Sequence, residues 1–198
     1  MDRRLSEISR HFSFDGDPAE AIPCVIGHIN DTYTLRCALS GGGTRRYILQ
    51  RIDHHVFRNP EKMMENIAGV TGHMRRKILL SGGDPERETL NIVPARDGGS
   101  FFRTAGGDYW RAYVFIENAH SRDLVEDPDQ FYGAGKLLGK FQGLLADYPI
   151  EGLHETIPGF HDTGKRFGRF IEAVEKDTVN RARDVREEID FVVRRADD

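Results

Sequence analysis

The stretch that decides the fold reads Gly27-His28-Ile29-Asn30-Asp31-Thr32-Tyr33, and it continues after a glycine turn as Tyr47-Ile48-Leu49-Gln50-Arg51. Its first part is a loop of small and polar residues between two apolar runs. Gly, Asn and Thr in such a loop let backbone N–H groups approach a bound anion. The pattern predicts two antiparallel strands and a third strand that brings Gln50 and Arg51 close to the loop. On these residues alone, an ordinary exposed turn is the more common explanation.

Length and composition narrow the class of protein. The chain has 198 residues, 38% of them hydrophobic and 30% charged, as expected for one large or two small globular domains. The net charge of -4 argues against general nucleic-acid binding, which depends on a basic surface. We find no apolar run of membrane-spanning length and no signal-peptide pattern at the N-terminus. The sequence therefore predicts neither a nucleic-acid partner nor a membrane partner.

The chain has two cysteines, Cys24 and Cys37, too few for a disulfide scaffold. They flank the loop almost symmetrically and could face one another across the hairpin. We expect two reduced, half-buried thiols, and the cytoplasm as the compartment.

The secondary-structure pattern of the first part mixes strands with one long helix. A short amphipathic helix is expected within residues 1–14, and strands over 21–26, 32–39 and 47–52. Asn59 followed by Pro60 then starts a helix with an apolar residue every three or four positions, which ends at Ser81-Gly82-Gly83. Further strands are expected over the ranges 88–95, 100–104 and 108–117. This order predicts an α+β lobe with one helix inserted after the third strand.

Composition changes after Asn118, where a polar connector leads into helical patterns. Helices are expected from Asp127 to about Tyr148, over 162–176 and over 179–195. Glycines in the first of these helices suggest close helix–helix approach. We therefore place a domain boundary near residue 118, with a sheet domain over 1–118 and a helical domain over 119–198.

Several separated blocks of sequence agree in order with one known family. They are Gly27-His28-Ile29-Asn30-Asp31-Thr32-Tyr33, Tyr47-Ile48-Leu49-Gln50-Arg51-Ile52, Glu65-Asn66-Ile67 with Val70-Thr71, Trp110-Arg111-Ala112-Tyr113-Val114-Phe115-Ile116-Glu117, Gly139-Lys140-Phe141-Gln142 and Glu155-Thr156-Ile157-Pro158-Gly159-Phe160-His161-Asp162-Thr163. Together they resemble the N-terminal part of the N-acetylhexosamine 1-kinases, in the aminoglycoside phosphotransferase and choline kinase superfamily. The resemblance covers the chain from His11 onward and implies a protein-kinase-like fold.

The resemblance also implies a reaction and a set of contacts. The reaction is ATP-dependent phosphorylation of the anomeric hydroxyl of an N-acetylhexosamine, with Mg²⁺ between the phosphates. The nucleotide-binding residues it implies are Gly27, Asn30, Asp31, Thr32, Gln50, Arg51, Phe115, Ile116 and Glu117. His28 would reach toward the sugar, and the helix that begins at Asn59 would be the regulatory helix of the small lobe.

One departure from the kinase pattern concerns the phosphates. Kinases generally hold the α- and β-phosphates with a lysine on the third strand. The corresponding residue here is Gln50, so the positive charge would come from Arg51 or from elsewhere. Its partner on the helix would be Glu65 or Asn66, and the sequence does not choose between them.

A second departure concerns catalysis and metal binding. The resemblance implies that the catalytic and metal-binding segment follows the helix ending near Arg195, whereas the given chain stops at Asp198. We therefore expect a catalytically incomplete chain with an incomplete helical lobe, no turnover, and self-association through the apolar face of residues 127–195. No catalytic or metal-binding residue is assigned. His161-Asp162-Thr163 is interpreted as a helix cap, and His54-His55 as a solvated turn.

Two alternatives stay open. The first is a kinase for another small molecule, such as an aminoglycoside, choline or homoserine. The second is a non-catalytic nucleotide-binding or interaction module. The arginines within 181–195 alternate with acidic residues, which indicates a salt-bridged solvent face and not a nucleic-acid site.

Overall fold

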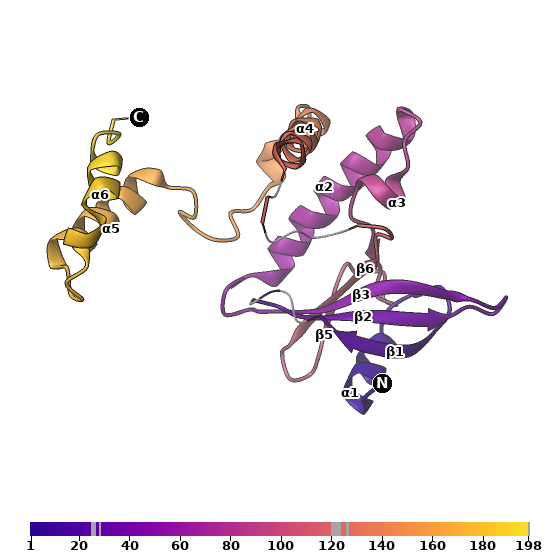
Figure 1. Cartoon of the computed structure of the whole chain (residues 1–198). Helices are drawn as coiled ribbons and strands as arrows, with labels where there is room; N and C mark the ends of the chain where they lie inside the picture. Colours follow the sequence, from indigo (N-terminus) through magenta and orange to yellow (C-terminus); the bar gives the residue numbers. More distant parts are fainter. Residues whose placement is uncertain (25–26, 28, 120–123, 126, 198) are drawn as a thin grey trace. The chain divides into compact units, whose positions relative to one another are not determined.

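The structure is a computed structural model that describes residues 1–24, 27, 29–119, 124–125 and 127–197 (Figure 1). The chain divides into two compact units, Met1–Thr156 and Ile157–Asp198. The first unit holds the sheet and the longer helices, and the second holds a helical pair. The division between these units falls after Thr156, not near residue 118. The domain boundary near residue 118 therefore stays a prediction.

The first unit is built on an antiparallel sheet, which in the described residues has six strands. They are β1 (Asp17–Pro23), β2 (Asp31–Ala38), β3 (Thr44–Ile52), β4 (Ile92–Val93), β5 (Phe102–Arg103) and β6 (Tyr109–Val114). The order is β1-β2-β3-β6-β4, and β5 pairs with β6 beside that path. The strand β6 thus lies between β3 and β4, as expected for a central strand.

The register fixes which side chains share a face. Thr32, Gln50 and Arg111 pair across β2, β3 and β6, so all three lie on one face. Their neighbours Asp31 and Arg51 pair with each other and lie on the opposite face, because successive side chains of a strand alternate.

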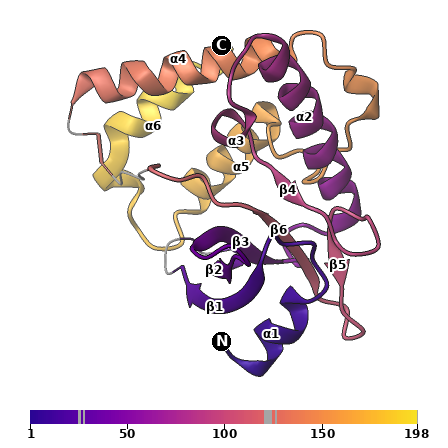
Figure 2. The same cartoon turned by 90° about the vertical axis from the view of Figure 1, so that its right-hand side faces the viewer.

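Each face of the sheet is covered by one helix (Figures 1 and 2). The helix α1 (Arg3–Ser9) begins after Asp2, whose carboxylate accepts from the N–H of Leu5 at 2.9 Å. One core lies between α1 and the sheet, and its largest fully buried members include Phe12, Leu35, Leu49 and Trp110. We call this the α1 face.

The opposite face carries α2 (Pro60–Leu80), so we call it the α2 face. The Asn59 side chain accepts from the N–H of Lys62 at 3.1 Å, which confirms the predicted cap. Met64 is fully buried and packs with Ile52 in a second, smaller core. Much of the α2 face is polar instead, and the candidate site lies there.

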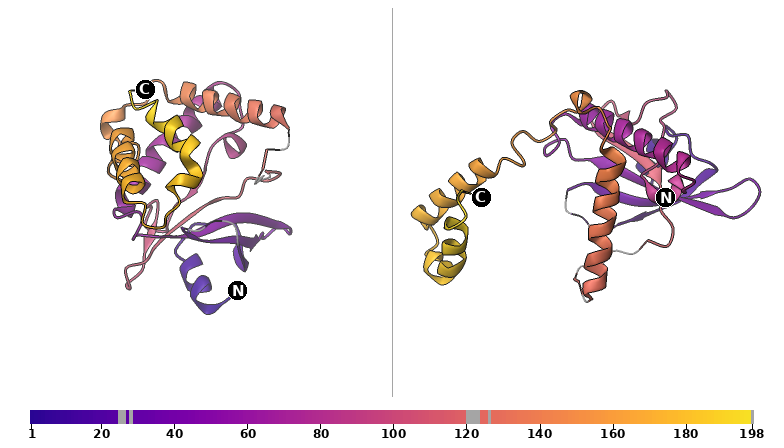
Figure 3. Two further views of the ribbon diagram at one scale, coloured as in Figure 1. Left: turned by 60° about the vertical axis from the view of Figure 1, so that its left-hand side comes forward. Right: turned by 90° about the horizontal axis from the view of Figure 1, so that it is seen from above.

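Two further helices complete the first unit. The short helix α3 (Pro85–Glu88) begins after the cap Asp84 and overlaps the predicted strand over 88–95 only at Glu88. The prediction of strands over 88–95 and 100–104 was therefore too long, since only the two-residue strands β4 and β5 form there. The helix α4 (Pro128–Leu145) contacts α2 (Figure 3).

The glycines of α4 do not mediate the close helix approach that the sequence suggested. In the described part of the chain, nothing lies within 4 Å of a Cβ placed at Gly133, Gly135 or Gly139. On α2 it is Gly69 that is crowded, because an added Cβ there would collide with the hydroxyl of Tyr148. Close packing thus occurs on α2, at the segment that follows α4.

The second unit, taken by itself, holds α5 (Thr163–Lys176), the 3-10 turn η2 (Ala182–Val185) and α6 (Arg186–Val193). The Asp162 carboxylate accepts from the N–H of Lys165 at 2.9 Å, so the interpretation of this residue as a cap is confirmed. Between the two helices lies a hollow of about 630 Å³, partly lined by Phe167, Phe170 and Phe191.

The antiparallel α+β lobe with a helix after the third strand is confirmed. In the described residues, no helix is both long enough and apolar enough to cross a bilayer.

Candidate functional site

The loop between β1 and β2 stands at one edge of the α2 face. Gly27 has φ 119°, a value that favours glycine. The Asn30 side chain accepts from the N–H of Asp53 at 2.9 Å, which ties the loop to the end of β3. His28 lies outside the described residues, so its predicted sugar contact stays a prediction.

The core of the candidate site is a hydrogen-bonded chain across three strands. The Gln50 amide nitrogen donates to the hydroxyl of Thr32 at 2.7 Å. The amide oxygen of Gln50 accepts from Nε and Nη2 of Arg111, at 2.9 and 2.6 Å. The remaining Nη1 of Arg111 lies 3.9 Å from the sulfur of Met64 on α2. These contacts fix the guanidinium on the α2 face, beside Gln50.

Burial lowers the pKa of Arg111, while Tyr113 favours its charged form. Among the residues that the structure describes, no carboxylate pairs with this guanidinium. Charged side chains are seldom buried without an opposite charge. The site therefore combines a partly desolvated cation with a nearby glycine-containing loop.

Arg51 does not join this chain, although the sequence grouped it with Gln50. Its guanidinium donates to the Asp31 carboxylate at 2.7 Å and to Asp108 at 3.4 Å, on the α1 face. Arg4 of α1 binds the other oxygen of Asp108 at 2.8 Å. Asp31 and Arg51 therefore form an ion-pair network on the side of the sheet away from Gln50.

Neither candidate helix partner of Gln50 contacts it. The Asn66 amide donates to the carbonyl of His154 at 2.8 Å, and its oxygen accepts from the His154 N–H at 2.9 Å. Glu65 binds the imidazole of His154 at 2.6 Å. Both side chains thus hold the segment after α4, and α2 presents Met64 to the sheet cluster.

The connector after β6 is held from one side by charged groups. Arg46 of β3 binds the Glu117 carboxylate with two nitrogens and stacks 4.0 Å above the ring centre of Phe115. These hydrogen bonds lower the pKa of Glu117. The N–H of Phe115 donates to the carbonyl of Arg46 at 3.2 Å. In the described part of the chain, the backbone N–H and C=O of Ile116 have no hydrogen-bond partner.

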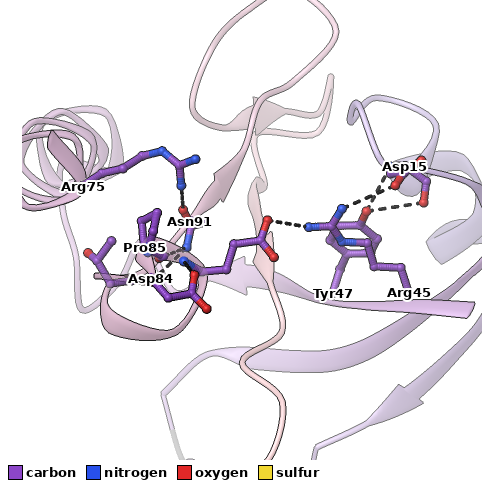
Figure 4. Close-up of polar contacts among 9 residues, drawn as sticks. Asp15, Arg45, Tyr47, Arg75, Asp84, Pro85 and Asn91 are labelled. Carbon is purple, nitrogen blue, oxygen red and sulfur yellow. Dashed lines mark hydrogen bonds and ion pairs between the residues drawn. The ribbon is translucent and has the colours of Figure 1, made fainter. Parts of the chain in front are cut away.

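A second group of hydrogen bonds fixes the end of β6, where the connector begins (Figure 4). The side chain of Asn91 donates to the carbonyl of Pro85 at 2.7 Å and accepts from Arg75 of α2. The backbone carbonyl of Asn91 accepts from the N–H of Val114 at 2.8 Å. One residue thus joins α2, α3 and the end of β6, which fixes where the connector leaves the sheet.

The described residues offer no metal site. No group of three His, Cys, Asp or Glu side chains among them could hold an ion. The ring of His54 lies tilted against that of His55 with 4.7 Å between ring centres, and within the described part of the chain its buried Nδ1 has no hydrogen-bond partner.

Sequence reasoning missed Arg111, although the sequence carried a signal for it. A charged residue stands in the middle of a run of bulky residues predicted to be a central strand. Such a residue calls for a partner or a ligand, because charged side chains are seldom buried without one.

The fold is shared with a known phosphotransferase. The chain is similar to spectinomycin phosphotransferase, APH(9)-Ia, solved in complex with ADP and spectinomycin, with a TM-score of 0.56 at 13% sequence identity. The alignment covers 100% of this chain and 56% of the phosphotransferase. No family model matches the sequence. The chain therefore has the fold of the kinase-like small-molecule phosphotransferases and spans about half the length of this neighbour.

Proposed function

We propose that this chain is the nucleotide-binding part of an ATP-dependent small-molecule phosphotransferase. The observation that carries the proposal is that β3 links the loop at one of its ends to the connector at the other. The Thr32 end of the loop pairs with Gln50, and the connector begins at the hydrogen bond from Phe115 to Arg46. Four residues of strand span about 13 Å, comparable to an extended nucleotide. Phosphates at the loop and adenine at the connector would therefore fit along one strand.

The proposed contacts follow from this placement. Adenine would bind the unpaired backbone groups of Ile116, between Phe115 and Glu117. The phosphates would lie by the backbone of Gly27, Asn30 and Asp31 and by the side chains of Thr32 and Gln50. Arg51 would support the loop through its ion pair with Asp31.

ATP supplies the phosphoryl group in this reaction, and the residues of this chain would bind and orient it. We assign none of the described residues to proton transfer from the acceptor. The narrower proposal for the acceptor is the anomeric hydroxyl of an N-acetylhexosamine, with His28 near the sugar. The fold neighbour was solved with spectinomycin, so an aminocyclitol is the competing acceptor class. The cytoplasm, where ATP is abundant, stays the proposed compartment.

Calorimetric titration of the full chain with ADP, ATP and AMP tests the proposal. We expect ADP and ATP to bind and AMP to bind more weakly. If none of the three nucleotides binds at millimolar concentration, the proposal is contradicted. A coupled assay with N-acetylglucosamine, N-acetylgalactosamine or spectinomycin then reports whether this chain transfers phosphate and to which acceptor.

We also propose self-association through α4. In the described residues, no side chain of α4 is buried, and Phe131, Tyr132 and Leu137 are 71%, 74% and 68% exposed. Exposed apolar patches of this kind commonly mark interaction sites. Sedimentation at tens of micromolar should give a species larger than the monomer, and a monodisperse monomer would contradict this.

A further inference from the structure

We infer that Arg111 of β6 supplies the positive charge that holds the nucleotide's phosphates, in place of the lysine that kinases carry on the third strand. The inference rests on the proposed function and names one residue of the same site. Gln50 then acts as a positioning residue that aims the guanidinium and carries no charge of its own.

The first support is placement. Gln50 and Arg111 are directly paired in the register of β3 and β6, so their side chains leave the sheet on the same face. Arg111 therefore stands one strand away from the position where a lysine would be, on the face that also carries Thr32.

The second support is the hydrogen-bond pattern around the guanidinium. Gln50 accepts from Nε and Nη2, while its amide nitrogen is engaged by the Thr32 hydroxyl, so the orientation of the amide is fixed. An arginine has five N–H donors, and this arrangement leaves donors on Nη1 and Nη2. Planar paired donors of this kind suit a phosphate.

The third support is charge. Arg111 is partly buried, and among the described residues it has no carboxylate partner. A lysine at position 50 would place a second cation beside it, whereas glutamine accepts its hydrogen bonds. Gln50 thus accepts hydrogen bonds from Arg111 without adding a second positive charge. A bound phosphate would provide the missing anion.

A purely structural role for Arg111 would predict a different result. In that case the arginine only fills the space between Gln50 and Met64, and its replacement lowers the stability of the fold without changing phosphate selectivity. The ratio of affinities for ADP and adenosine separates the two roles, since adenosine lacks the phosphates.

The experiment compares the wild-type chain with Arg111→Met, Arg111→Lys and the control Arg36→Met. Arg36 lies on β2 in an exposed ion pair with Glu20, so it matches the charge change elsewhere on the sheet. Thermal unfolding confirms that each variant is folded, and calorimetry gives Kd for ADP and adenosine. We expect Arg111→Met to raise Kd for ADP at least tenfold and Kd for adenosine less than twofold. Arg111→Lys should retain part of the ADP affinity, and Arg36→Met should change neither value.

Equal weakening of ADP and adenosine by Arg111→Met would overturn the inference, and so would an unchanged affinity for ADP. If Arg111→Met does not fold, competition on the wild type decides: inorganic pyrophosphate should displace ADP, and failure to compete would overturn the inference. Binding of neither nucleotide by the wild type would overturn the proposed function and this inference together. The double variant Gln50→Lys/Arg111→Met should recover part of the ADP affinity that Arg111→Met loses.

Discussion

Asn66 of α2 binds the backbone of His154 with both ends of its amide, at 2.8 and 2.9 Å, across 88 residues of sequence. The segment that follows α4 is therefore attached to the helix that covers the candidate site. Glu65 adds an ion pair to the His154 side chain. Met64, which directly precedes Glu65 on α2, packs against the sheet residue Ile52, so a change at this contact would reach the sheet through Met64.

The first prediction concerns this attachment. Asn66→Ala should cost about 1 kcal/mol of stability, because two backbone groups lose their partner. Hydrogen exchange at the amide of His154 should accelerate more than the average of the unit. Glu65→Gln is the matched control, since it changes only an exposed ion pair and should cost less than about 0.5 kcal/mol. Equal effects of the two variants would contradict the account.

A pair of glycines in α2 gives the second prediction. Gly72→Ala should stabilise the fold by up to about 1 kcal/mol, since alanine favours the helix and in the described residues nothing lies within 4 Å of the added Cβ. Gly69→Ala should gain less or lose stability, because its Cβ would displace the Tyr148 hydroxyl. Urea unfolding of both variants measures the difference, and the opposite order would show that the segment after α4 does not pack here.

The two thiols should differ in reactivity and in their effect on alkaline stability. Cys37 is fully buried, and burial raises its pKa from 9.0 to about 11, with smaller contributions from Asp17 and Asp15. Cys24 is partly exposed on the other face of the sheet, 3.3 Å from the Thr34 hydroxyl. A thiol reagent should therefore modify Cys24 first and Cys37 only on unfolding.

The raised pKa of Cys37 in the folded chain determines how folding stability changes with pH. The unfolded chain loses the Cys37 proton at lower pH than the folded chain, so folding stability should fall as the pH rises from about 9 to about 11. The maximal loss is about 3 kcal/mol, because each unit of pKa difference corresponds to about 1.4 kcal/mol. Cys37→Ala should remove this part of the alkaline loss in pH-dependent unfolding. An unchanged slope in that variant would contradict the assignment.

The last variant prediction concerns the connector. Arg46→Met removes the ion pair to Glu117 and the stacking on Phe115, so it should raise Kd for ADP about fivefold, which corresponds to about 1 kcal/mol. Arg45→Met is the control, because Arg45 pairs with Asp15 and Glu86 and, among the described residues, with neither Phe115 nor Glu117 (Figure 4). A larger effect at Arg45 would argue against adenine binding beside residue 116.

Local signals made much of the fold predictable, and tertiary pairing accounts for the rest. The cap at Asn59 and the repeat through Ile78 defined α2, because both depend on neighbours in the sequence. The strand predicted over 88–95 is shorter in the structure because Glu88 ends α3 and only Ile92 and Val93 pair with β6. The environment of each cysteine could be assigned only from the strand register. The register places Cys37 in the core between α1 and the sheet and Cys24 on the α2 face.

The candidate site was only partly predictable for a similar reason. The loop and Gln50 were visible in the sequence, but their partner Arg111 lies 61 residues further on. Strand alternation could have separated Arg51 from Gln50, since adjacent strand residues face opposite ways. Only the pairing of β3 with β6 brings Arg111 to the site.

The central claim is that the α2 face of the sheet binds a nucleotide between the loop and the connector. Hydrogen exchange of the full chain with and without ADP tests it most directly. We predict protection confined to residues 29–34, 48–52 and 115–117. Protection in other segments only, or none at an ADP concentration of several millimolar, would contradict it.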